Sequence, residues 1–472
     1  MRKVFSLMLF AALLVIAPQA QAEQVKRVKV DKPIRMLPAS AYLIATYDET
    51  GRPDACIIDR AGIAETPSGK MIFYIGILPT RVTAQNIDKA GAFTVNILDA
   101  NVVPQADYCG NVSNQDAELD KFKVTGLKLA KGDDVNAPIV TDCPVNFECK
   151  VIKALMLPDS QHKIFFGEII SYHVKSNLLI GDKTKPVMQF DHVKDAATAY
   201  VPGSSEGSGY YEFNGPLGKR GKVWREKFHD VKLISAAAAN HKPADNKNKE
   251  PEIKEQAQDS DALLKFTGAP HFLPAPVMTV GAYTSNGEAN FAVFHRGGFL
   301  TSGKGGNDRL AIGIKDIKHS LTYKLIKETG ACTVNIPSTK YLAEVDLLGS
   351  FSGLTPDGKE FQDKLKAAGL TAAKAETVNA PYINEMPITL ECELEDEFCE
   401  SDASKGRLLI LKIKSVSANE DYLDARGKIN PIGKDGSSIL FFSHSHAANG
   451  GYYGLGKFLG KSGNVSEKFM AK

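Results

Sequence analysis

The chain has 472 residues and a nearly balanced charge, with 57 Lys and Arg against 55 Asp and Glu. Hydrophobic residues make up 43% and charged residues 24%, which is ordinary globular composition and excludes a collagen-like or wholly disordered chain. The formal net charge of +2 gives no reason to expect a nucleic acid as partner. The length allows two domains of about 200 residues, each large enough for its own core.

Residues 1–22 have the pattern of a secretory signal peptide. Met1–Lys3 is basic, Val4–Ile16 is apolar, and Ala20–Ala22 has the small-residue pattern of a cleavage site. The apolar run is shorter than the roughly 20 residues that a membrane helix needs; an uncleaved anchor is the alternative. We expect a mature chain that begins near Glu23, is exported, has no membrane span after cleavage and, in a Gram-negative cell, is periplasmic.

Closely spaced strands dominate the chain that follows. Runs of β-branched and aromatic residues bounded by Gly or Pro predict strands; in the first half they are Ala41–Tyr47, Lys70–Ile75, Ala92–Leu98 and Lys163–Ile170. Between them, the spacing of apolar residues predicts a short helix over Thr80–Ala90. Many strands with few helices favour a mainly β fold, a β-barrel with short helices, over a parallel α/β sheet.

The chain contains an internal duplication. Three segments return later in the same order: Gly91–Ile97 as Gly330–Ile336, Cys143–Cys149 as Met386–Cys392, and Gly209–Lys219 as Gly451–Lys461. The spacing of about 240 residues indicates a duplicated domain and not a solenoid of short units. We expect copy 1 at 30–224, a polar linker at 225–265 and copy 2 at 266–468. The predicted helix of copy 1 has its counterpart at Ser320–Thr329.

Both copies contain an ordered series of short motifs. A strand leads into the turn segments Pro53–Gly62 and Ala289–Gly298, and a helix start that carries Thr precedes the Thr-Val-Asn-Ile strand. His162–Glu168 and Tyr452–Gly460 follow later in the chain. In this order the motifs resemble the flavin reductase-like, FMN-binding split-barrel family, in particular its flavoredoxin-type branch. The resemblance implies two tandem split barrels, each with a cleft related to an FMN site.

Two further segment pairs extend the resemblance. Cys109–Gly110 and Asp120–Phe122 of copy 1 are matched with Leu348–Gly349 and Glu360–Phe361 of copy 2. Because members of the family are usually homodimers with FMN between subunits, the resemblance implies that the fused copies pack as an intramolecular pseudo-dimer. The chain would then be a monomer that acts as a pseudo-dimer, or a homodimer.

The resemblance implies that the FMN phosphate binds at the helix start that carries Arg81 and Thr83. A helix N-terminus offers backbone N–H groups and a favourable dipole, while Arg adds charge and Thr a hydroxyl. The alternative is that Thr83 only caps the helix and that Arg81 faces water. In copy 2, Thr322 holds the Thr position, and Ser320 and His319 stand on the Arg side.

The same resemblance places the turn of Ile57, Ile58, Asp59 and Arg60 along the flavin ring. Arg60 and Arg296 occupy the same place in the two copies, where the family often has Trp. An Arg can stack its guanidinium on the ring or contact the ring's O2/N1 edge. A salt bridge between the domains is the alternative.

His162 fits the family's His-x-Leu-x-x-Gly-Glu pattern, which implies a position near the flavin; an ordinary surface His is the alternative. Gly406 takes its place in copy 2, which keeps Asn290 and Thr322 instead. We therefore expect one working FMN site, in copy 1, and one degraded site, in copy 2.

The seven cysteines are an odd number, so at least one is unpaired in a monomer. Cys149 and Cys392 fall on predicted strands and are expected to be buried. Whether Cys109 pairs with Cys143 stays open, because a sequence does not give their distance. The segment His444–His446 offers two His without a third ligand, so no metal site is predicted.

These features predict an FMN-dependent oxidoreductase or electron carrier. No catalytic side chain is expected, because the flavin itself performs the redox chemistry. The family usually takes electrons from NAD(P)H, but export would separate this chain from the nicotinamide pools of the cytosol, so a redox partner protein or a small reductant or acceptor is expected. The alternative is a non-catalytic module that binds a small ligand or haem in a degraded flavin cleft.

Overall fold

The computed structural model describes residues 25–30, 39–65, 70–113, 119–180, 187–188, 197–204, 207–214, 217–219, 223–227, 262–268, 274–301, 308–350, 363–399, 406–443, 451–462 and 464–470. The predicted signal peptide, most of the predicted linker and the segment His444–His446 lie outside these residues. In the described part of the chain, no helix has the length and apolar character needed to cross a membrane.

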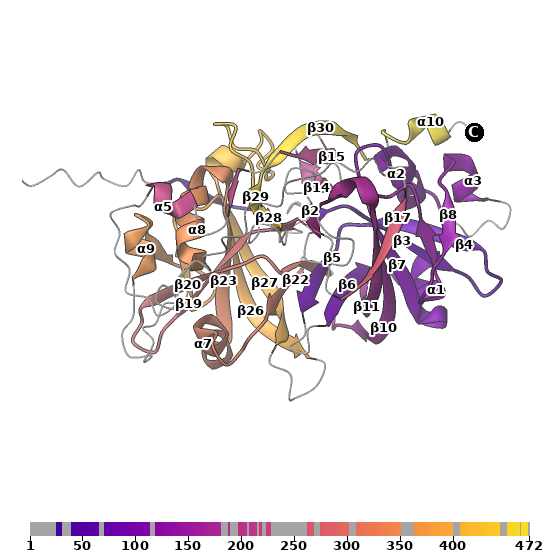
Figure 1. The fold of residues 1–472 in the computed structure, drawn as a ribbon. Coiled ribbons are helices and arrows are strands. Elements are labelled where there is room, and N and C mark those ends of the chain that lie inside the picture. Colours follow the sequence, from indigo (N-terminus) through magenta and orange to yellow (C-terminus); the bar gives the residue numbers. More distant parts are fainter. Residues whose placement is uncertain are drawn as a thin grey trace, which may run out of the picture.

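Each copy is built on one antiparallel sheet of eight strands (Figure 1). In copy 1 the main order is β4 (Pro53–Ile58), β3 (Tyr42–Tyr47), β7 (Ala92–Ile97), β10 (Val145–Met156), β11 (Lys163–Lys175), β6 (Met71–Ile77) and β5 (Ala61–Glu65). In copy 2 it is β20 (Ala289–Phe294), β19 (Met278–Tyr283), β23 (Ala331–Ile336), β26 (Ile388–Phe398), β27 (Arg407–Asn419), β22 (Arg309–Ile314) and β21 (Gly297–Thr301). The identical order confirms the mainly β, duplicated fold predicted from the sequence.

The predicted helices of the two copies are present as α1 (Val82–Ala90) and α7 (Leu321–Thr329). Both end at a glycine in the left-handed conformation, Gly91 with φ 63° and Gly330 with φ 69°, which is the usual way to end a helix before a tight turn. The sequence did not predict the other helical segments: α2 (Val103–Asn111), α3 (Lys121–Thr125), α5 (Val223–Lys227), α8 (Leu342–Ser350), α9 (Lys364–Ala367), α10 (Glu467–Met470), η1 (Ser176–Leu178), η4 (Thr339–Tyr341) and η5 (Glu420–Tyr422).

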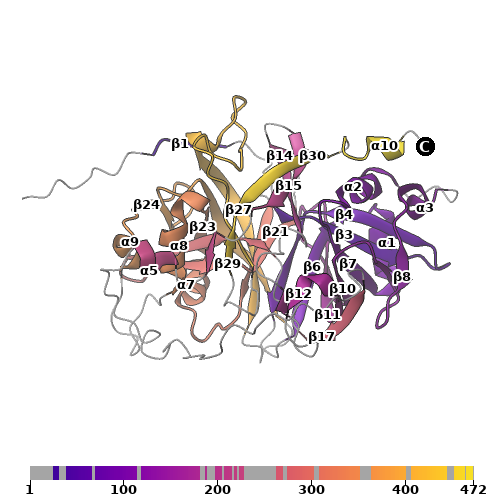
Figure 2. The same ribbon diagram turned by 45° about the horizontal axis from the view of Figure 1, so that its top comes forward.

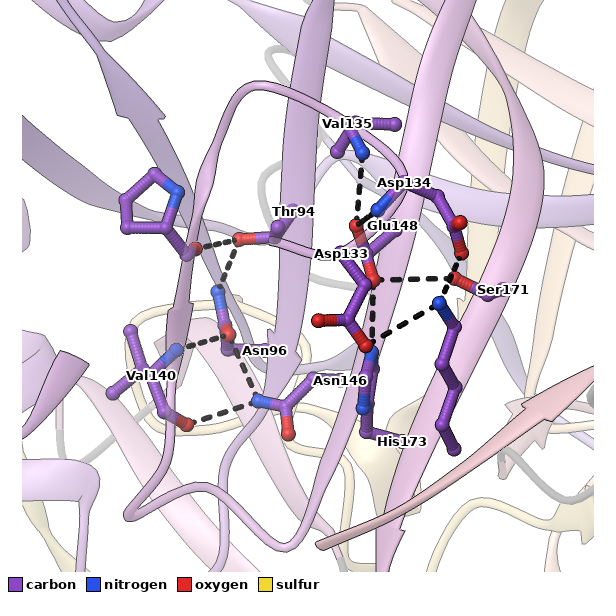
Figure 3. Close-up of polar contacts among 12 residues, drawn as sticks. Thr94, Asn96, Asp133, Asp134, Val135, Val140, Asn146, Glu148, Ser171 and His173 are labelled. Carbon is purple, nitrogen blue, oxygen red and sulfur yellow. Dashed lines mark hydrogen bonds and ion pairs between the residues drawn. The ribbon is translucent and has the colours of Figure 1, made fainter. Parts of the chain in front are cut away.

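The repeated Thr-Val-Asn-Ile strand has a structural role in both copies. The Asn96 amide donates to the Leu43 carbonyl at 2.9 Å. Its oxygen accepts from the Val140 backbone N–H at 2.9 Å (Figure 3). Asn335 repeats this in copy 2, where it donates to Thr279 and accepts from Ile383. Since both Asn side chains are fully buried, they need these partners, and the motif is explained by packing.

The ends of each copy cross over to the other copy. β1 (Arg27–Lys29) pairs with β27 of copy 2, while β17 (Leu263–Thr267) pairs with β11 of copy 1. Two small sheets combine strands of both copies: β2 (Ala39–Ser40), β14 (Thr198–Ser204), β15 (Gly207–Phe213) and β30 (Leu455–Lys461) in one, and β16 (Gly218–Lys219), β29 (Gly451–Tyr453), β28 (Phe441–Ser443) and β18 (Ala275–Pro276) in the other.

These crossings correct the predicted domain boundaries. The helix α5 and the strand β17 overlap the two ends of the predicted linker 225–265, and β1 lies before the predicted start of copy 1 at residue 30. These elements are too short for their hydrophobic pattern to predict them from the sequence. The strands β1 and β17 form only because they pair with a strand of the other copy. Three two-stranded ladders complete the described strands: β8 (Leu129–Lys131) with β9 (Pro138–Val140), β12 (Leu179–Ile180) with β13 (Val187–Met188), and β24 (Ala372–Lys374) with β25 (Pro381–Ile383).

The two barrels also share an apolar interface. Phe166 of copy 1 and Phe398 of copy 2 stack with ring centroids 4.3 Å apart, within a buried cluster that contains residues of both copies. At Gly76 the backbones approach so closely that a Cβ atom would lie 1.9 Å from the carbonyl oxygen of Leu300. The chain is therefore an intramolecular pseudo-dimer, as the resemblance implied.

Candidate functional site

Copy 1 contains a cavity of about 260 Å³, which we call the copy 1 cleft. Six of the residues predicted to bind FMN line it: Ile57, Ile58, Asp59, Arg60, Arg81 and His162. The other lining residues are Cys56, Gly76, Ile77, Leu78, Gly110, Asn111, Tyr200 and Ser462. The structure thus brings together the strand β4, the start of α1, the end of α2 and the residue before β11.

The start of α1 forms one wall of the copy 1 cleft. Arg81 is the N-cap residue, and among the described residues no side chain caps this helix end. The first N–H groups of a helix have no partner within the helix, so α1 presents donors and the positive end of its dipole here. Arg81 is exposed, and its guanidinium donates to the Gly110 carbonyl at 3.1 Å.

Gly110 lets this wall close tightly. A Cβ atom at this position would lie 2.3 Å from Cγ2 of Ile57, so any larger residue would displace the strand β4 from the helix α2. The glycine of the Cys-Gly motif is therefore explained by the close approach of two cleft walls.

Thr83 lies behind the cleft and is not one of its lining residues. Its hydroxyl is buried and donates to the Asp54 carboxylate at 2.5 Å. The Lys121 ammonium, also buried, donates to the same carboxylate at 2.8 Å and to the Ala55 carbonyl. Because the Thr83 hydroxyl donates its proton to Asp54, Thr83 connects α1 to β4 and does not make the predicted phosphate contact.

The turn after β4 carries an ion pair. Arg60 Nη1 lies 2.8 Å from Asp59 Oδ1, and both side chains are half-buried. This ion pair lies within copy 1, whereas the sequence left open a bridge between the domains. Burial raises the pKa of the neighbouring Cys56 thiol to about 11, so Cys56 is a neutral wall residue at physiological pH.

His162 closes the far side of the cleft. It is 7% exposed, and its backbone N–H donates to the Ser160 hydroxyl oxygen at 3.0 Å. This burial excludes the ordinary surface His that the sequence left as an alternative. In copy 2, Gly406 directly precedes β27 as His162 precedes β11, so the predicted alignment of these two residues is correct.

The equivalent region of copy 2 is almost closed. Its cavity measures about 20 Å³ and is lined by Val277, Val293, His295, Gly349, Phe442 and Tyr452. His295 stands where copy 1 has Asp59, and its ring centroid lies 4.5 Å from that of Phe442, which takes the place of Tyr200. Two rings thus fill the space that is open in copy 1.

The predicted site residues Ser320, Asn290 and Thr322 of copy 2 form hydrogen bonds within copy 2. The Ser320 hydroxyl accepts from the Tyr323 backbone N–H at 3.2 Å and caps α7. Asn290, at the position of Asp54, donates to Thr322 at 2.9 Å, and both are buried. These side chains do not line the small cavity of copy 2.

Arg296 holds the same place as Arg60, as predicted. The carbonyl of Arg296 accepts from Gly313 N–H at 2.8 Å, and that of Arg60 from Gly76 N–H at 2.7 Å. Arg296, however, is absent from the lining of the copy 2 cavity. Of these two equivalent arginines, Arg60 lines a cavity and Arg296 does not.

One predicted correspondence is wrong. Asp120 caps α3 and Asp363 caps α9, so the counterpart of Asp120–Phe122 begins at Asp363 and not at Glu360. The lysines that follow agree, because Lys121 donates to the Cys109 carbonyl and Lys364 to the Leu348 carbonyl. The segment Glu360–Phe361 itself lies outside the described residues.

All seven cysteines lie in the described part of the chain and are thiols. Cys149 and Cys392 are fully buried on β10 and β26, as predicted. Cys109 and Cys143 are also buried but are not joined in this structure, so the disulfide that the sequence left open is not formed.

A second polar cluster of copy 1 lies where the loop after β8 meets β10, β11 and β17 (Figure 3). Within the described residues, Asp133, Glu148 and His173 place their ligand atoms within 4.8 Å of one another. Glu148 accepts from His173 Nε2 at 2.8 Å and from the Asp134 and Val135 backbone. The Lys265 ammonium of β17 lies 3.3 Å from Asp133 and 2.8 Å from Asp134. A lysine therefore supplies the cation here and fastens β17 to copy 1.

Comparison with known proteins agrees with this architecture. The model of the flavin reductase like domain matches residues 34–191 and 271–433, one match in each copy. The chain belongs to the flavin reductase-like family. The family binds flavin cofactors, and the copy 1 cleft is the larger of the two cavities at equivalent positions in its two domains.

Individual relatives cover single copies. An uncharacterized protein, YdfE, of Bacillus subtilis (strain 168) is 28% identical over 139 residues, or 28% of this chain and 63% of its own length. The match to an Aeropyrum pernix protein covers 36% of that protein, so the chain spans only part of these curated relatives. Among solved structures, flavoredoxin of Desulfovibrio vulgaris (Miyazaki F) is 27% identical, with 41% of this chain and 94% of that chain covered and a TM-score of 0.34.

The residues of the cleft wall that were not among the predicted site residues are Cys56, Gly76, Ile77, Leu78, Gly110, Asn111, Tyr200 and Ser462. Asn111 and Tyr200 carry no motif, and Ser462 belongs to the end of copy 2 although it lines a cleft in copy 1. The internal duplication could have indicated part of this wall. The hydrogen-bonded pair Asp107 and Tyr210 of copy 1 is repeated in copy 2 as Asp346 and Tyr452.

Proposed function

We propose that the copy 1 cleft binds one FMN per chain and that the protein is an FMN-dependent oxidoreductase or electron carrier. Membership of the flavin reductase-like family supports a flavin. The choice of FMN depends on how the cleft is built. One observation carries it: the start of α1, which has Arg81 beside it and no side-chain cap within the described part of the chain, opens into the cleft.

The donor set fits a phosphate group. Backbone N–H groups at a helix start and an arginine guanidinium are the preferred partners of a phosphate dianion. Gly110 allows the end of α2 to approach β4 closely. Its carbonyl accepts a hydrogen bond from the Arg81 guanidinium, which fixes Arg81 beside the start of α1. In copy 2 the corresponding helix start is capped by Ser320, so the same donors are less accessible there.

The remaining lining residues would bind and orient the ring. When bound, a flavin supplies the hydride or electron chemistry by itself. Arg60 offers a planar cation that can face an electron-rich ring edge, and Asp59 fixes it at 2.8 Å. His162 is buried in the wall and excludes water from that side. These roles require no acid–base residue.

We further propose that the protein is exported and exchanges electrons with a redox partner protein or a small reductant or acceptor. The support is the leader-like pattern of residues 1–22. Nicotinamide pools are cytosolic, so an exported chain needs another donor.

The test is FMN titration of the mature chain from Glu23, followed by flavin fluorescence, with Arg81→Ala, Arg81→Lys and Ser320→Ala. We expect Arg81→Ala to weaken FMN binding by about 10- to 100-fold, because a charge-assisted contact is lost. Arg81→Lys should recover part of the affinity. Ser320→Ala, the matched change in copy 2, should leave the affinity unchanged.

Riboflavin, which lacks the phosphate, serves as the control ligand and should bind all four proteins equally. Equal FMN affinity of the parent and Arg81→Ala would contradict the phosphate site. A parent chain that binds haem or another small ligand but no flavin would favour the non-catalytic binding module.

A further inference from the structure

The copy 1 cleft contains one residue that comes from copy 2. Of its lining residues that the structure describes, Ser462 alone belongs to the end of the chain, after the strand β30. β30 pairs with β15 of copy 1 and carries the chain across the pseudo-dimer, so that α10 lies beside α2 (Figure 2). We call the described residues 462 and 464–470 the C-terminal arm.

Asp107 of α2 fastens this arm. The hydroxyls of Ser462 and Ser466 each donate to the Asp107 carboxylate, to Oδ1 and Oδ2 respectively, at 2.7 Å. Tyr210 donates to Oδ1 at 2.8 Å. Asp107 and Ser466 are fully buried, and a buried carboxylate must have such donors to be tolerated. The arm is thus tied to α2 by charge-assisted hydrogen bonds.

Apolar packing holds the rest of the arm. The rings of Phe469 and Tyr108 meet edge-on with centroids 5.9 Å apart. Val465 packs against the apolar cluster that surrounds α2 in copy 1. The arm therefore docks on copy 1 through both polar and apolar contacts.

The fastened helix leads directly into the cleft wall. Three residues after Asp107 the chain reaches Gly110, whose carbonyl holds Arg81 at 3.1 Å. Asn111 lines the cleft and donates to the Asp107 carbonyl at 2.9 Å. A shift of the arm would consequently move both the Ser462 wall and the residues that hold Arg81.

The reverse arm, after copy 1, has a different sequence. Gly209–Lys219 matches Gly451–Lys461, so Arg220 and Trp224 stand at the sequence positions of Ser462 and Ser466. The serines are present only in the arm that reaches the open cleft. This difference is independent of the cavity volumes and points to the same copy.

The geometry points to a composite site: the C-terminal arm of copy 2 completes the flavin cleft of copy 1, with Ser462 as a wall residue and Asp107 as the positioning residue. This inference rests on the proposed function. Because Ser462 gives its proton to Asp107, its oxygen offers only lone pairs to the cleft. It is suited to accept a hydrogen bond from a ligand donor, such as a hydroxyl of the polyol chain of FMN.

The test compares FMN affinity and release rate in the full mature chain with Ser462→Ala, Ser462→Thr, Asp107→Asn and the control Ser350→Ala. Ser350 donates to the backbone carbonyl of Asp346 on α8, the helix of copy 2 that matches α2, so its removal leaves the Asp346 carboxylate and the C-terminal arm untouched. We expect Ser462→Ala to weaken FMN binding by about fivefold, the effect of one hydrogen bond. Ser462→Thr should restore the affinity, and Ser350→Ala should not change it.

Asp107→Asn should speed FMN release by about 10-fold, because one amide oxygen replaces two carboxylate oxygens as acceptor. Hydrogen exchange in the arm should increase in the same variant, with or without FMN. An unchanged affinity in Ser462→Ala would overturn the inference.

If the parent chain binds no FMN, the proposed function fails. Faster hydrogen exchange of the C-terminal arm in Asp107→Asn would then still support the wall shared by the two copies, and unchanged hydrogen exchange would overturn it.

Discussion

Copy 1 and copy 2 have the same strand order and the same buried Asn in the motif strand, yet one holds a cavity of about 260 Å³ and the other one of about 20 Å³. Few positions make this difference. Asp59 and Tyr200 in copy 1 become the ring pair His295 and Phe442 in copy 2. The fold is thus retained by its buried network, while the cavity depends on a few side chains at its mouth.

The helix starts differ in the same direction. Ser320 caps α7, whereas the start of α1 carries Arg81 and has no side-chain cap among the described residues. A cap satisfies the donors that an anion would use. The two copies exchange strands in both directions, but among the described residues the C-terminal arm of copy 2 adds Ser462 to the wall of the copy 1 cleft.

The largest effect is expected at the buried pair Lys121–Asp54, which copy 2 lacks because Asn290 replaces Asp54. Asp54→Asn should destabilise the chain by about 4 kcal/mol, since it leaves a buried ammonium without its carboxylate. Urea unfolding at pH 7 measures this. A loss below about 1 kcal/mol, the scale of a surface pair, would show that the pair is unimportant.

The reciprocal change, Asn290→Asp, sharpens the same comparison. Burial lowers the pKa of Lys364 to about 8, from an ordinary value of 10.5. The unfolded chain therefore binds more protons between these values, and stability should rise as pH increases from about 8 to 10.5. Asn290→Asp should remove this rise. A rise that persists in the variant would show that the new carboxylate does not reach Lys364.

A smaller effect is expected for Glu148. Burial alone would raise its pKa, but the hydrogen bonds from His173 and from the Asp134 and Val135 backbone lower the pKa to about 2. The ordinary value is 4.5, so this stabilisation is complete above pH 4.5 and is lost as pH falls toward 2. It amounts to about 3 kcal/mol.

Unfolding measured between pH 5 and pH 3 tests this with Glu148→Gln, which should flatten the loss of stability. The matched control is Glu391→Gln in copy 2, where Ser417 stands at the position of His173 and Thr377 donates to the carboxylate at 2.6 Å. Equal pH profiles for the parent and Glu148→Gln would contradict the assignment.

The smallest effect is expected at the two tyrosines. Tyr210 donates to Asp107 at 2.8 Å, and Tyr452 donates to Asp346 at 3.0 Å. Tyr210→Phe and Tyr452→Phe should each cost about 1 kcal/mol of stability, since each removes one hydrogen bond. Only Tyr210→Phe should also weaken FMN binding. If both variants weakened it equally, the cleft would not be confined to copy 1.

Local patterns predicted much of this molecule. The strands, the two main helices and the cleft residues near Arg81 and His162 lie within short motifs. The crossing arms could not be predicted, because Ser462 and Asp107 are 355 residues apart in sequence. Thr83 shows a second limit: a Thr at a helix start can face a ligand or a buried carboxylate, and only the position of Asp54 decides between them.

The most direct test of the account is the amount of FMN that the purified chain from Glu23 onward retains after desalting, quantified by absorbance after denaturation. The account predicts one FMN per chain, because copy 2 is closed by His295 and Phe442 and capped by Ser320. Two FMN per chain would show that both copies bind, and none would remove the basis for a flavin site in copy 1.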